Sequence, residues 1–362
     1  MIHFPAVEYI RWAKTHPTAR INLARSGAEP CPPAALGLTR RDLVVTLPVN
    51  DGYAPLRAAI ARRYRVHPDQ TFTVSGGTSF ANWFACAAAL NDARGEAIVE
   101  KPTYEPLLRI PQALGCRIVR LERRFEEGYA VDLRRFESLV TPRTRIAIVS
   151  NLHNPSGARI DGATLRRMAS ILRRVGAFLV VDEVYLECLF GRRADSCVHA
   201  GPNVVTTNSL TKAYGLDGLR AGWVLGPREV IRRAWSIQDL LANNGVAPGE
   251  RMSLAAFRHL PAIRRRAHAT LDPNLERLRR YFAAEPRLEA FMPAGGNVVF
   301  PRVPRGLDTD VLASHLLERY STLVVPGRFF ESPRHIRISF GMSRRVFERG
   351  LANISRALDD LS

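Results

Sequence analysis

Short apolar, β-branched runs alternate with helical patterns along the first two thirds of the chain. The runs cover 70–75, 96–100, 144–150, 177–181, 203–207 and 220–225. Strands that alternate with helices form βαβ units, in which the helices pack on the faces of a mostly parallel sheet. We therefore predict an α/β fold whose large domain is such a sheet flanked by helices.

The pattern changes after about residue 230 and predicts a smaller α+β domain. Asp272 and Pro273 suit a helix start, because Asp caps and Pro fits the first turn. The N-terminal segment, rich in proline and small residues, is expected to join this second domain. The predicted division is 1–40 (N-terminal segment), 41–270 (large domain) and 271–362 (small domain). The expected helices of the small domain cover 271–282, 308–320 and 343–361, and its strands cover 297–301, 322–325 and 335–340.

The chain is basic, with a formal net charge of +18, but lysine occurs only at Lys14, Lys101 and Lys212. The arginines are spread along the chain, and there is no RNA-binding aromatic motif or zinc finger. A solvated arginine-rich surface is therefore expected instead of a nucleic-acid site. Lys14 and Lys101 are expected at the surface. The five cysteines form no CxxC pair, so we expect reduced, mostly buried thiols and no metal site.

No apolar run approaches the length of a membrane span, and the first residues do not follow the pattern of a secretory signal. The protein is therefore expected to be cytoplasmic, without a membrane partner.

Polar residues follow nearly every predicted strand, at 76–79, 101–104, 151–157, 182–185 and 208–212. The carboxyl ends of parallel strands meet at one edge of a sheet, where ligands bind. A glycine turn that opens a helix is a phosphate seat, to which Ser209, Thr211 and Arg220 add donors. Tyr104 can stack on a flat ring, a buried Asp182 needs a cation, and Lys212 can form an imine with an aldehyde. Together these groups describe a site for pyridoxal 5′-phosphate (PLP).

The segment 209–223 (SLTKAYGLDGLRAGW) resembles the lysine motif of the fold-type I, class I/II aminotransferases. The segments 154–157 (NPSG) and 182–185 (DEVY) are similar to two further motifs of that family, in the family's order. The resemblance extends over roughly 20–355. It implies the PLP-transferase major domain, with a seven-stranded sheet, and a PLP cofactor.

The resemblance also implies catalytic roles. Lys212 would form the imine and move a proton between the substrate Cα and the cofactor. Asp182 would keep the ring nitrogen protonated, and Asn154 and Tyr185 would hydrogen-bond the phenolic oxygen. The catalytic residues implied are Lys212, Asp182 and Tyr185. The cofactor-binding residues implied are Tyr53, Gly77, Thr78, Tyr104, Asn154, Asp182, Tyr185, Ser209, Thr211, Lys212 and Arg220.

For the substrate α-carboxylate, the resemblance implies Arg337, Gly27 and Asn154. Arg328, Arg334 and Arg344 remain close alternatives to Arg337. Arg25, Ser26, His153 and Asn297 are further candidates for lining the site, from their positions alone. His153 is expected to be structural or substrate-lining, and it is not placed among the catalytic residues.

The first functional hypothesis is an aminotransferase that moves an amino group from an α-amino acid to a 2-keto acid. The alternatives are a PLP-dependent lyase or cyclase, similar to capreomycidine synthase, and a decarboxylase. The shared motifs bind the cofactor and not the substrate side chain, so they leave these reactions open. Because the family tyrosine at the position of Tyr53 reaches the phosphate of the neighbouring subunit, a homodimer with shared active sites is expected.

Overall fold

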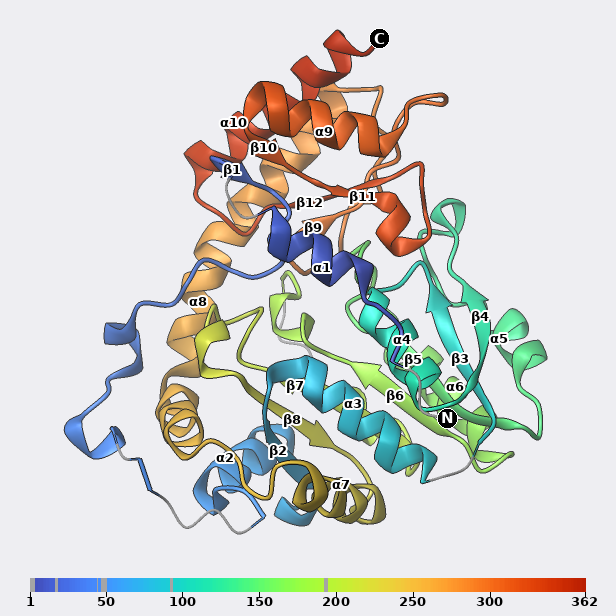
Figure 1. Cartoon of the computed structure of the whole chain (residues 1–362), viewed down its shortest axis with the longest axis vertical. Coiled ribbons are helices and arrows are strands. Elements are labelled where there is room, and N and C mark those ends of the chain that lie inside the picture. Colours follow the sequence, from blue (N-terminus) through green and yellow to red (C-terminus); the bar gives the residue numbers. More distant parts are fainter. Residues whose placement is uncertain (1–3, 17–18, 44, 47–50, 92–93, 192–194) are drawn as a thin grey trace.

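The computed structural model describes residues 4–16, 19–43, 45–46, 51–91, 94–191 and 195–362. A seven-stranded sheet with helices on both faces forms the larger part of the molecule (Figure 1). In spatial order, the strands are β2 (Thr71–Ser75), β8 (Ala221–Leu225), β7 (Val204–Ser209), β6 (Phe178–Asp182), β5 (Thr144–Ser150), β3 (Glu96–Lys101) and β4 (Arg117–Glu122).

The predicted mostly parallel sheet is confirmed, since only β8 among these seven strands runs against its neighbours. The sequence pattern did not reveal β4, which lies at the edge of the sheet beside β3. Its sequence, RIVRLE, contains as many charged as apolar residues, and only Leu121 is buried. An edge strand needs one apolar face at most, so it lacks the continuous apolar run of the central strands.

Alternate side chains of the central strands enter two different apolar cores. In β5, Ile146 and Ile148 pack in the core under α3 and α7, whereas Ala147 and Val149 pack in the core under α5 and α6. This follows from the two-residue repeat of a strand buried on both faces. The helices of this part are α2 (Ala54–Tyr64), α3 (Gly77–Leu90), α4 (Glu105–Ala113), α5 (Leu133–Leu139), α6 (Gly162–Arg173) and α7 (Arg228–Leu241).

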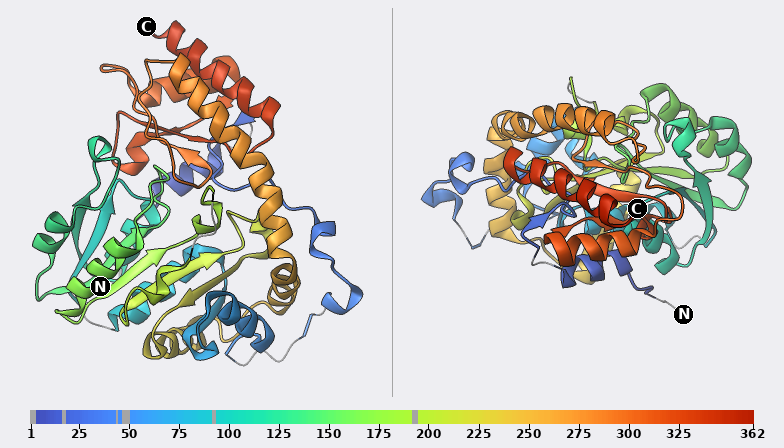
Figure 2. Two further views of the ribbon diagram at one scale, coloured as in Figure 1. Left: turned by 180° about the vertical axis from the view of Figure 1, so that it is seen from behind. Right: turned by 90° about the horizontal axis from the view of Figure 1, so that it is seen from above.

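A single long helix, α8 (Ala247–Ala284), runs from the large sheet to the smaller part of the molecule (Figure 2). The predicted helix start at Asp272 is therefore wrong, because Pro273 lies inside α8. The helix continues through the proline because its inward face stays packed: Leu271 and Leu278 are fully buried on either side. Tertiary packing thus outweighs the local preference for a helix start.

The smaller part contains α9 (Thr309–Tyr320), α10 (Arg344–Asp360) and a three-stranded antiparallel sheet of β11 (Val325–Pro326), β12 (Ile336–Ser339) and β9 (Val298–Val299). From the N-terminal segment, β1 (Ile21–Asn22) pairs with β10 (Thr322–Leu323). Helix α1 (Glu8–Thr15) lies between the two parts (Figure 1). The division at residues 40 and 270 stays a prediction.

Within the described residues, no helix has the length and apolarity required to cross a membrane.

Candidate active site

A cavity of about 640 Å³ opens at the carboxyl ends of the parallel strands, and the N-terminal segment forms its other wall. The loops after β2, β3, β5, β6 and β7 all contribute to its lining, as the pattern of polar strand ends predicts. The sequence-predicted residues that line it are Gly27, Thr78, Tyr104, Asn154, Asp182, Tyr185, Thr211, Lys212 and Arg220. Predicted residues outside the lining are Tyr53, Gly77, Ser209 and Arg337.

Lys212 enters the cavity from the loop that follows β7. Its Nζ donates a hydrogen bond to Ser26 Oγ at 2.7 Å. Burial, reinforced by the positive charge of Arg337, lowers the pKa of Lys212 to about 8. A substantial part of the amine is therefore neutral near physiological pH, which is the form that attacks an aldehyde.

Asp182 ends β6 and is only 4% exposed. Its two oxygens accept hydrogen bonds from Asn82 Nδ2 at 2.8 Å and from the Val184 backbone N–H at 2.9 Å. Burial raises the pKa of Asp182 to about 6, although both hydrogen bonds act in the opposite direction. Ionising this carboxyl group becomes favourable once a cation lies against it.

Asn82 is a site residue that the motif analysis missed. It lies on α3, is 1% exposed and joins Asp182 to Thr207, whose hydroxyl donates to Asn82 Oδ1. Its signal in the sequence is one amide within the apolar stretch 80–90, where an unpaired amide would be costly. The partner of that amide became visible only when α3 was placed across the sheet.

Hydroxyl and guanidinium groups gather at the N-terminus of α3. Thr78 donates to Ser209 Oγ at 2.7 Å, and the hydroxyls of Ser209 and Thr211 lie 2.6 Å apart. Arg220 donates to the Gly76 carbonyl at 2.7 Å. Gly77 has φ +71°, and a Cβ there would stand 3.1 Å from the Arg220 guanidinium. Hydroxyl donors, a cation and the N-terminal end of a helix together form an anion-binding seat.

Two tyrosines and an asparagine form the side of the cavity nearest the N-terminal segment. Tyr185 OH donates to the Ser26 carbonyl at 2.9 Å. Tyr104 meets the ring of Tyr9 edge-on, with 6.0 Å between ring centroids. Asn154 Oδ1 accepts a hydrogen bond from Arg337 Nη1 at 3.2 Å. These contacts place polar groups around the space between Lys212 and Asp182.

Arg337 is fully buried and lies behind the lining. Its Nη2 donates to Tyr9 OH at 2.6 Å and to the Ala24 carbonyl at 3.0 Å. Its guanidinium also packs between the rings of Tyr9 and Phe330, 5.1 and 5.0 Å from their centroids. Contact with a substrate carboxylate would therefore require the Tyr9 hydroxyl to move or to share the guanidinium.

The alternatives to Arg337 lie elsewhere. Arg328 pairs with Asp310, and Arg344 pairs with Glu348, both at the surface. Arg334 does not line the cavity. Arg337 is thus the candidate that directly contacts a lining residue, Asn154, although its role stays a prediction.

His153 and Asn297 are both fully buried and outside the cavity lining. The His153 ring bonds Ser156 Oγ at 2.6 Å and the Pro102 carbonyl at 2.9 Å, which is a structural arrangement. Arg25 and Ser26, by contrast, do line the cavity.

Lys14 was expected only at the surface. It is exposed, yet it also lines the cavity, because α1 lies across the opening. Tyr9 is a further lining residue that no motif indicated, and Asp217 is one to which the lysine motif assigned no role. Their positions depend on how the N-terminal segment and the loop after Lys212 fold over the sheet, and no local pattern records that.

Tyr53 does not reach the cavity of its own chain. It precedes the first turn of α2, and α8 holds it at two points. Its backbone N–H donates to Glu250 Oε2 at 2.7 Å, and its hydroxyl accepts a hydrogen bond from Arg251. Its predicted contact with a phosphate therefore requires a second subunit.

The fold and this cavity define a class of enzyme that uses PLP. The family model for aminotransferases of class I and II matches residues 41–354, and the chain belongs to that family. Its cofactor is PLP.

Three similar proteins illustrate the range of the family. The chain is 32% identical to capreomycidine synthase of Streptomyces vinaceus, over 90% of this chain and 84% of that protein. It is 30% identical to the arginine–pyruvate transaminase AruH of Pseudomonas aeruginosa, over 86% of this chain and 81% of that protein. The solved structure of the PLP-dependent cyclase OrfR matches with a TM-score of 0.89 at 27% identity, covering 99% of this chain and 98% of that one.

The residues of the cavity fit PLP on physical grounds. Asp182 is a buried carboxyl group whose two oxygens contact Asn82 and Val184 and form no ion pair with any residue in the described part of the chain, as a site for a protonated ring nitrogen requires. The anion seat at α3 suits the phosphate, Tyr104 offers an aromatic face, and Lys212 offers an amine of lowered pKa. The individual roles of these residues remain predictions.

Proposed function

We propose that this enzyme is an aminotransferase that moves an amino group from an α-amino acid to a 2-keto acid. The observation that carries the proposal is the placement of the Lys212 amine and the Asp182 carboxyl group on one cavity, each with its pKa moved toward neutrality by burial. Such a pair suits a reaction that begins with removal of the proton from Cα.

Bound PLP supplies an aldehyde that bonds to amino groups and a ring that withdraws electrons from Cα. Lys212 Nζ takes the proton from Cα in its neutral form and can return it to a neighbouring carbon. Ser26 Oγ, 2.7 Å away, accepts a hydrogen bond from that nitrogen and orients it. Asp182, oriented by Asn82 and Val184, holds negative charge at the position of the ring nitrogen.

The substrate α-carboxylate is assigned to the side of the cavity that Gly27 and Asn154 line, with Arg337 behind Asn154. Arg337 is already hydrogen-bonded to Asn154, so a carboxylate that replaces the Tyr9 hydroxyl would contact both side chains. Burial makes this charge-assisted contact stronger than the same contact in water.

We also propose that the enzyme works as a homodimer. Among the exposed large apolar side chains of the described residues, Phe80 lies in the first turn of α3, Leu240 and Leu241 lie at the end of α7, and Val246 lies directly before α8; we group these four as an apolar patch. The Val246 N–H donates to Ser75 Oγ, and Phe80 packs against Gly76, so both flank the turn that opens α3. A second copy on this patch would cover apolar surface and bring the partner's Tyr53 toward the anion seat.

The reaction is tested with amino acids that carry nitrogen-15 at the α-amino group, with pyruvate as the acceptor. Arginine is the first donor to test, because the Pseudomonas relative is named for arginine and pyruvate. An aminotransferase yields nitrogen-15 alanine and the keto acid of the donor in equal amounts. Lys212→Ala abolishes this transfer, whereas Lys101→Ala, a surface control paired with Glu122, retains it. Donor consumption without the labelled amino acid of the acceptor, for every donor and acceptor pair, would reject the proposal.

A second candidate is a cyclase, favoured by the 32% identity to capreomycidine synthase and by the likeness to OrfR. A cyclase would form a new ring in the product and keep the nitrogen-15 in it. No keto acid acceptor would be consumed. Release of carbon dioxide instead would identify a decarboxylase. The same labelled mixture, analysed by mass spectrometry, separates the three reactions.

A further inference from the structure

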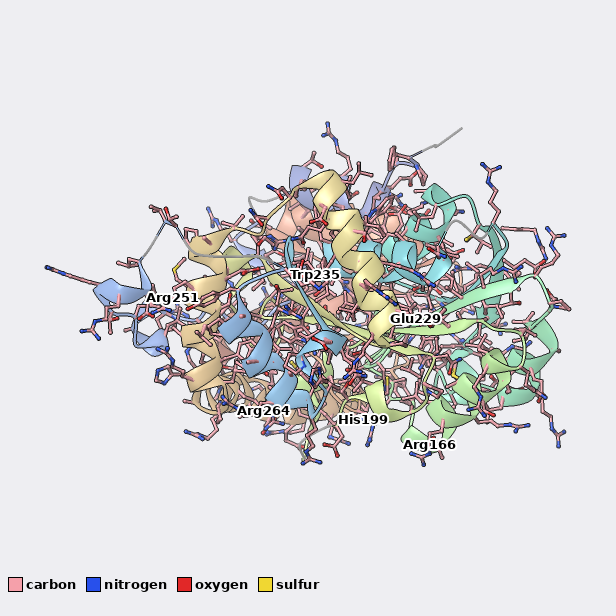
Figure 3. The ribbon with its side chains drawn as sticks, turned by 90° about the horizontal axis from the view of Figure 1, so that it is seen from below. Arg166, His199, Glu229, Trp235, Arg251 and Arg264 are labelled. Carbon is pink, nitrogen blue, oxygen red and sulfur yellow. The ribbon has the colours of Figure 1, made fainter. Side chains whose placement is uncertain are left out.

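A second cavity, of about 600 Å³, lies on the side of the sheet that carries α6. Its lining comes from the end of α2, from the loop between β5 and α6, from the first turns of α6 and from the segment before β7. Arg166 and His199 lie near each other at one edge of the molecule, away from Trp235 on α7 (Figure 3). The cavity shares no lining residue with the active site.

Arginine dominates the charge of this second cavity. Arg63, Arg65, Arg159 and Arg166 all line it, against Glu187 and Asp195. Arg63 is committed to Glu187, a carboxylate that is only 3% exposed. Its Nε remains buried without a partner. The opposite charges of Arg63 and Glu187 neutralise each other. The net charge of the cavity therefore depends on the three further arginines and Asp195.

These three arginines, Arg65, Arg159 and Arg166, make no ion pair or side-chain hydrogen bond with any residue that the structure describes. Many other arginines do pair: Arg123 lies 2.6 Å from Glu100, and Arg277 lies 2.9 Å from Glu348. Three like charges around one hollow repel each other, and Asp195 offsets only one of them. The hollow therefore has a positive potential that attracts an anion.

The size and arrangement of the second cavity indicate the kind of anion. The three arginines come from the end of α2, from the loop after β5 and from the first turns of α6, so three separate places in the fold supply them to one cavity. A terminal phosphate offers three equivalent oxygens to such a set, whereas a carboxylate offers two in one plane. The volume lies in the range of sites for small organic ligands, about 300–1,000 Å³. The cavity therefore has room for a small organic phosphate, beyond a bare ion.

We propose that this second cavity is a binding site for a small phosphate monoester, held by Arg65, Arg159 and Arg166. The loop after β5 carries Asn154 to the active site and Arg159 to the second cavity. The segment after β6 likewise carries Tyr185 to the first and Glu187 to the second. The two cavities are thus neighbours on shared loops.

The test is calorimetric titration of the PLP-loaded enzyme at low ionic strength, with glycerol 3-phosphate, inorganic phosphate and succinate as separate probes. The cofactor fills the anion seat at α3 and so removes that competing site. We expect saturable binding of glycerol 3-phosphate with a dissociation constant below about 1 mM, followed by phosphate and then by succinate. The double variant Arg159→Gln/Arg166→Gln should weaken it by about tenfold or more, because two charge-assisted contacts are lost.

The matched control is Arg349→Gln, which removes an exposed arginine outside both cavities and should leave the affinity unchanged. Both replaced arginines are at least partly exposed, so the double variant is expected to fold, and retained circular dichroism checks this. Absence of saturable heat, equal affinity in the double variant, or equal weakening in Arg349→Gln would overturn the proposal. Succinate binding as tight as that of the phosphate ester, and weakened equally in the double variant, would overturn the assigned ligand class.

Discussion

Lys212 and Asp182 are titratable groups whose pKa values burial moves in opposite directions, down to about 8 for the amine and up to about 6 for the carboxyl group. Desolvation disfavours the charged form of each. Both groups are therefore close to a change of protonation in the range in which enzymes work. The chemistry of the site thus depends on these two side chains and on their burial.

The first prediction concerns the reactivity of Lys212. In cofactor-free enzyme, the rate of covalent attachment to added PLP should rise with pH around a midpoint near 8, because the neutral amine attacks. Borohydride reduction and peptide mapping should place the pyridoxyl group on Lys212. The label should vanish in Lys212→Ala and persist in Lys101→Ala. A label on Lys14 or Lys101 would contradict the assignment.

The second prediction concerns pH and stability at Asp182. Its pKa is raised in the folded, cofactor-free protein, so the group stabilises the fold at low pH and this contribution is lost as pH rises through about 6. Between about pH 4 and about pH 8, the free energy of unfolding should fall by about 2 kcal/mol more in wild type than in Asp182→Asn. Urea unfolding at both pH values measures this difference. Asp217→Asn, an exposed lining carboxylate, should behave like wild type; parallel pH profiles for wild type and Asp182→Asn would refute the argument.

The third prediction concerns Asn82, which orients the Asp182 carboxylate. Asn82→Ala removes a hydrogen bond to a charged group, a loss of about 1.5–3 kcal/mol, so PLP should bind roughly tenfold or more weakly. Thr207→Val, which removes only the contact behind Asn82, should have a smaller effect. Fluorescence titration of the cofactor gives both values. Unchanged binding in Asn82→Ala would show that Val184 alone holds Asp182.

At the scale of elements, α8 illustrates how packing overrides local signals. It contains Pro261 and Pro273 in its interior and still extends over 38 residues, because its buried face is continuous between the two parts of the molecule. Each internal proline leaves one carbonyl of the preceding turn without its N–H partner. The helix is therefore held by its side chains more than by its backbone.

The fourth prediction tests this account. Pro273→Ala restores a backbone donor inside α8 and should raise the free energy of unfolding by about 1–2 kcal/mol, after the larger entropy of the unfolded chain is allowed for. Pro248→Ala, in the first turn where no N–H partner is needed, should give no increase. Urea unfolding compares the two variants. Destabilisation by Pro273→Ala would mean that the proline itself is required for packing between the two parts.

At the scale of the whole molecule, one chain leaves Tyr53 outside its own cavity and an apolar patch exposed. The exposed fraction is 53% for Phe80 and 60% for Leu241, although both belong to helices whose other faces are buried. Both features are explained together if two copies meet at the patch.

The fifth prediction follows from the proposed dimer. Tyr53→Phe should leave the dimer intact and weaken PLP binding by about 1.5–3 kcal/mol, through loss of one hydrogen bond to a charged phosphate. Tyr320→Phe, whose hydroxyl bonds Asp360 far from the cavity, should leave PLP binding unchanged. Sedimentation at low protein concentration, with activity followed in parallel, checks both. A fully active monomer would show that the site is complete within one chain and that Tyr53 is misassigned.

Local sequence patterns determined the large sheet and most of the cavity. Each central strand is a compact apolar run, and a polar segment follows each strand directly. The sheet alone therefore brings Asp182, Asn154 and Lys212 to one edge, independently of how the rest of the chain folds. The resemblance of the lysine motif to that of the aminotransferases indicated that the cofactor is PLP. These features are encoded within a few residues of each other, which is the range over which sequence patterns can be interpreted.

Only the tertiary structure decided the rest. Tyr9, Lys14 and Ser26 reach the cavity because β1 pairs with β10 and draws the N-terminal segment across the opening, a contact between residues about 300 positions apart. Asn82 meets Asp182 across 100 positions, and Pro273 lies inside a helix because distant side chains pack around it. The second cavity is likewise assembled from segments of the chain that are far apart in the sequence. Side-chain packing between remote segments leaves no periodic signal, so only the folded chain reveals these contacts.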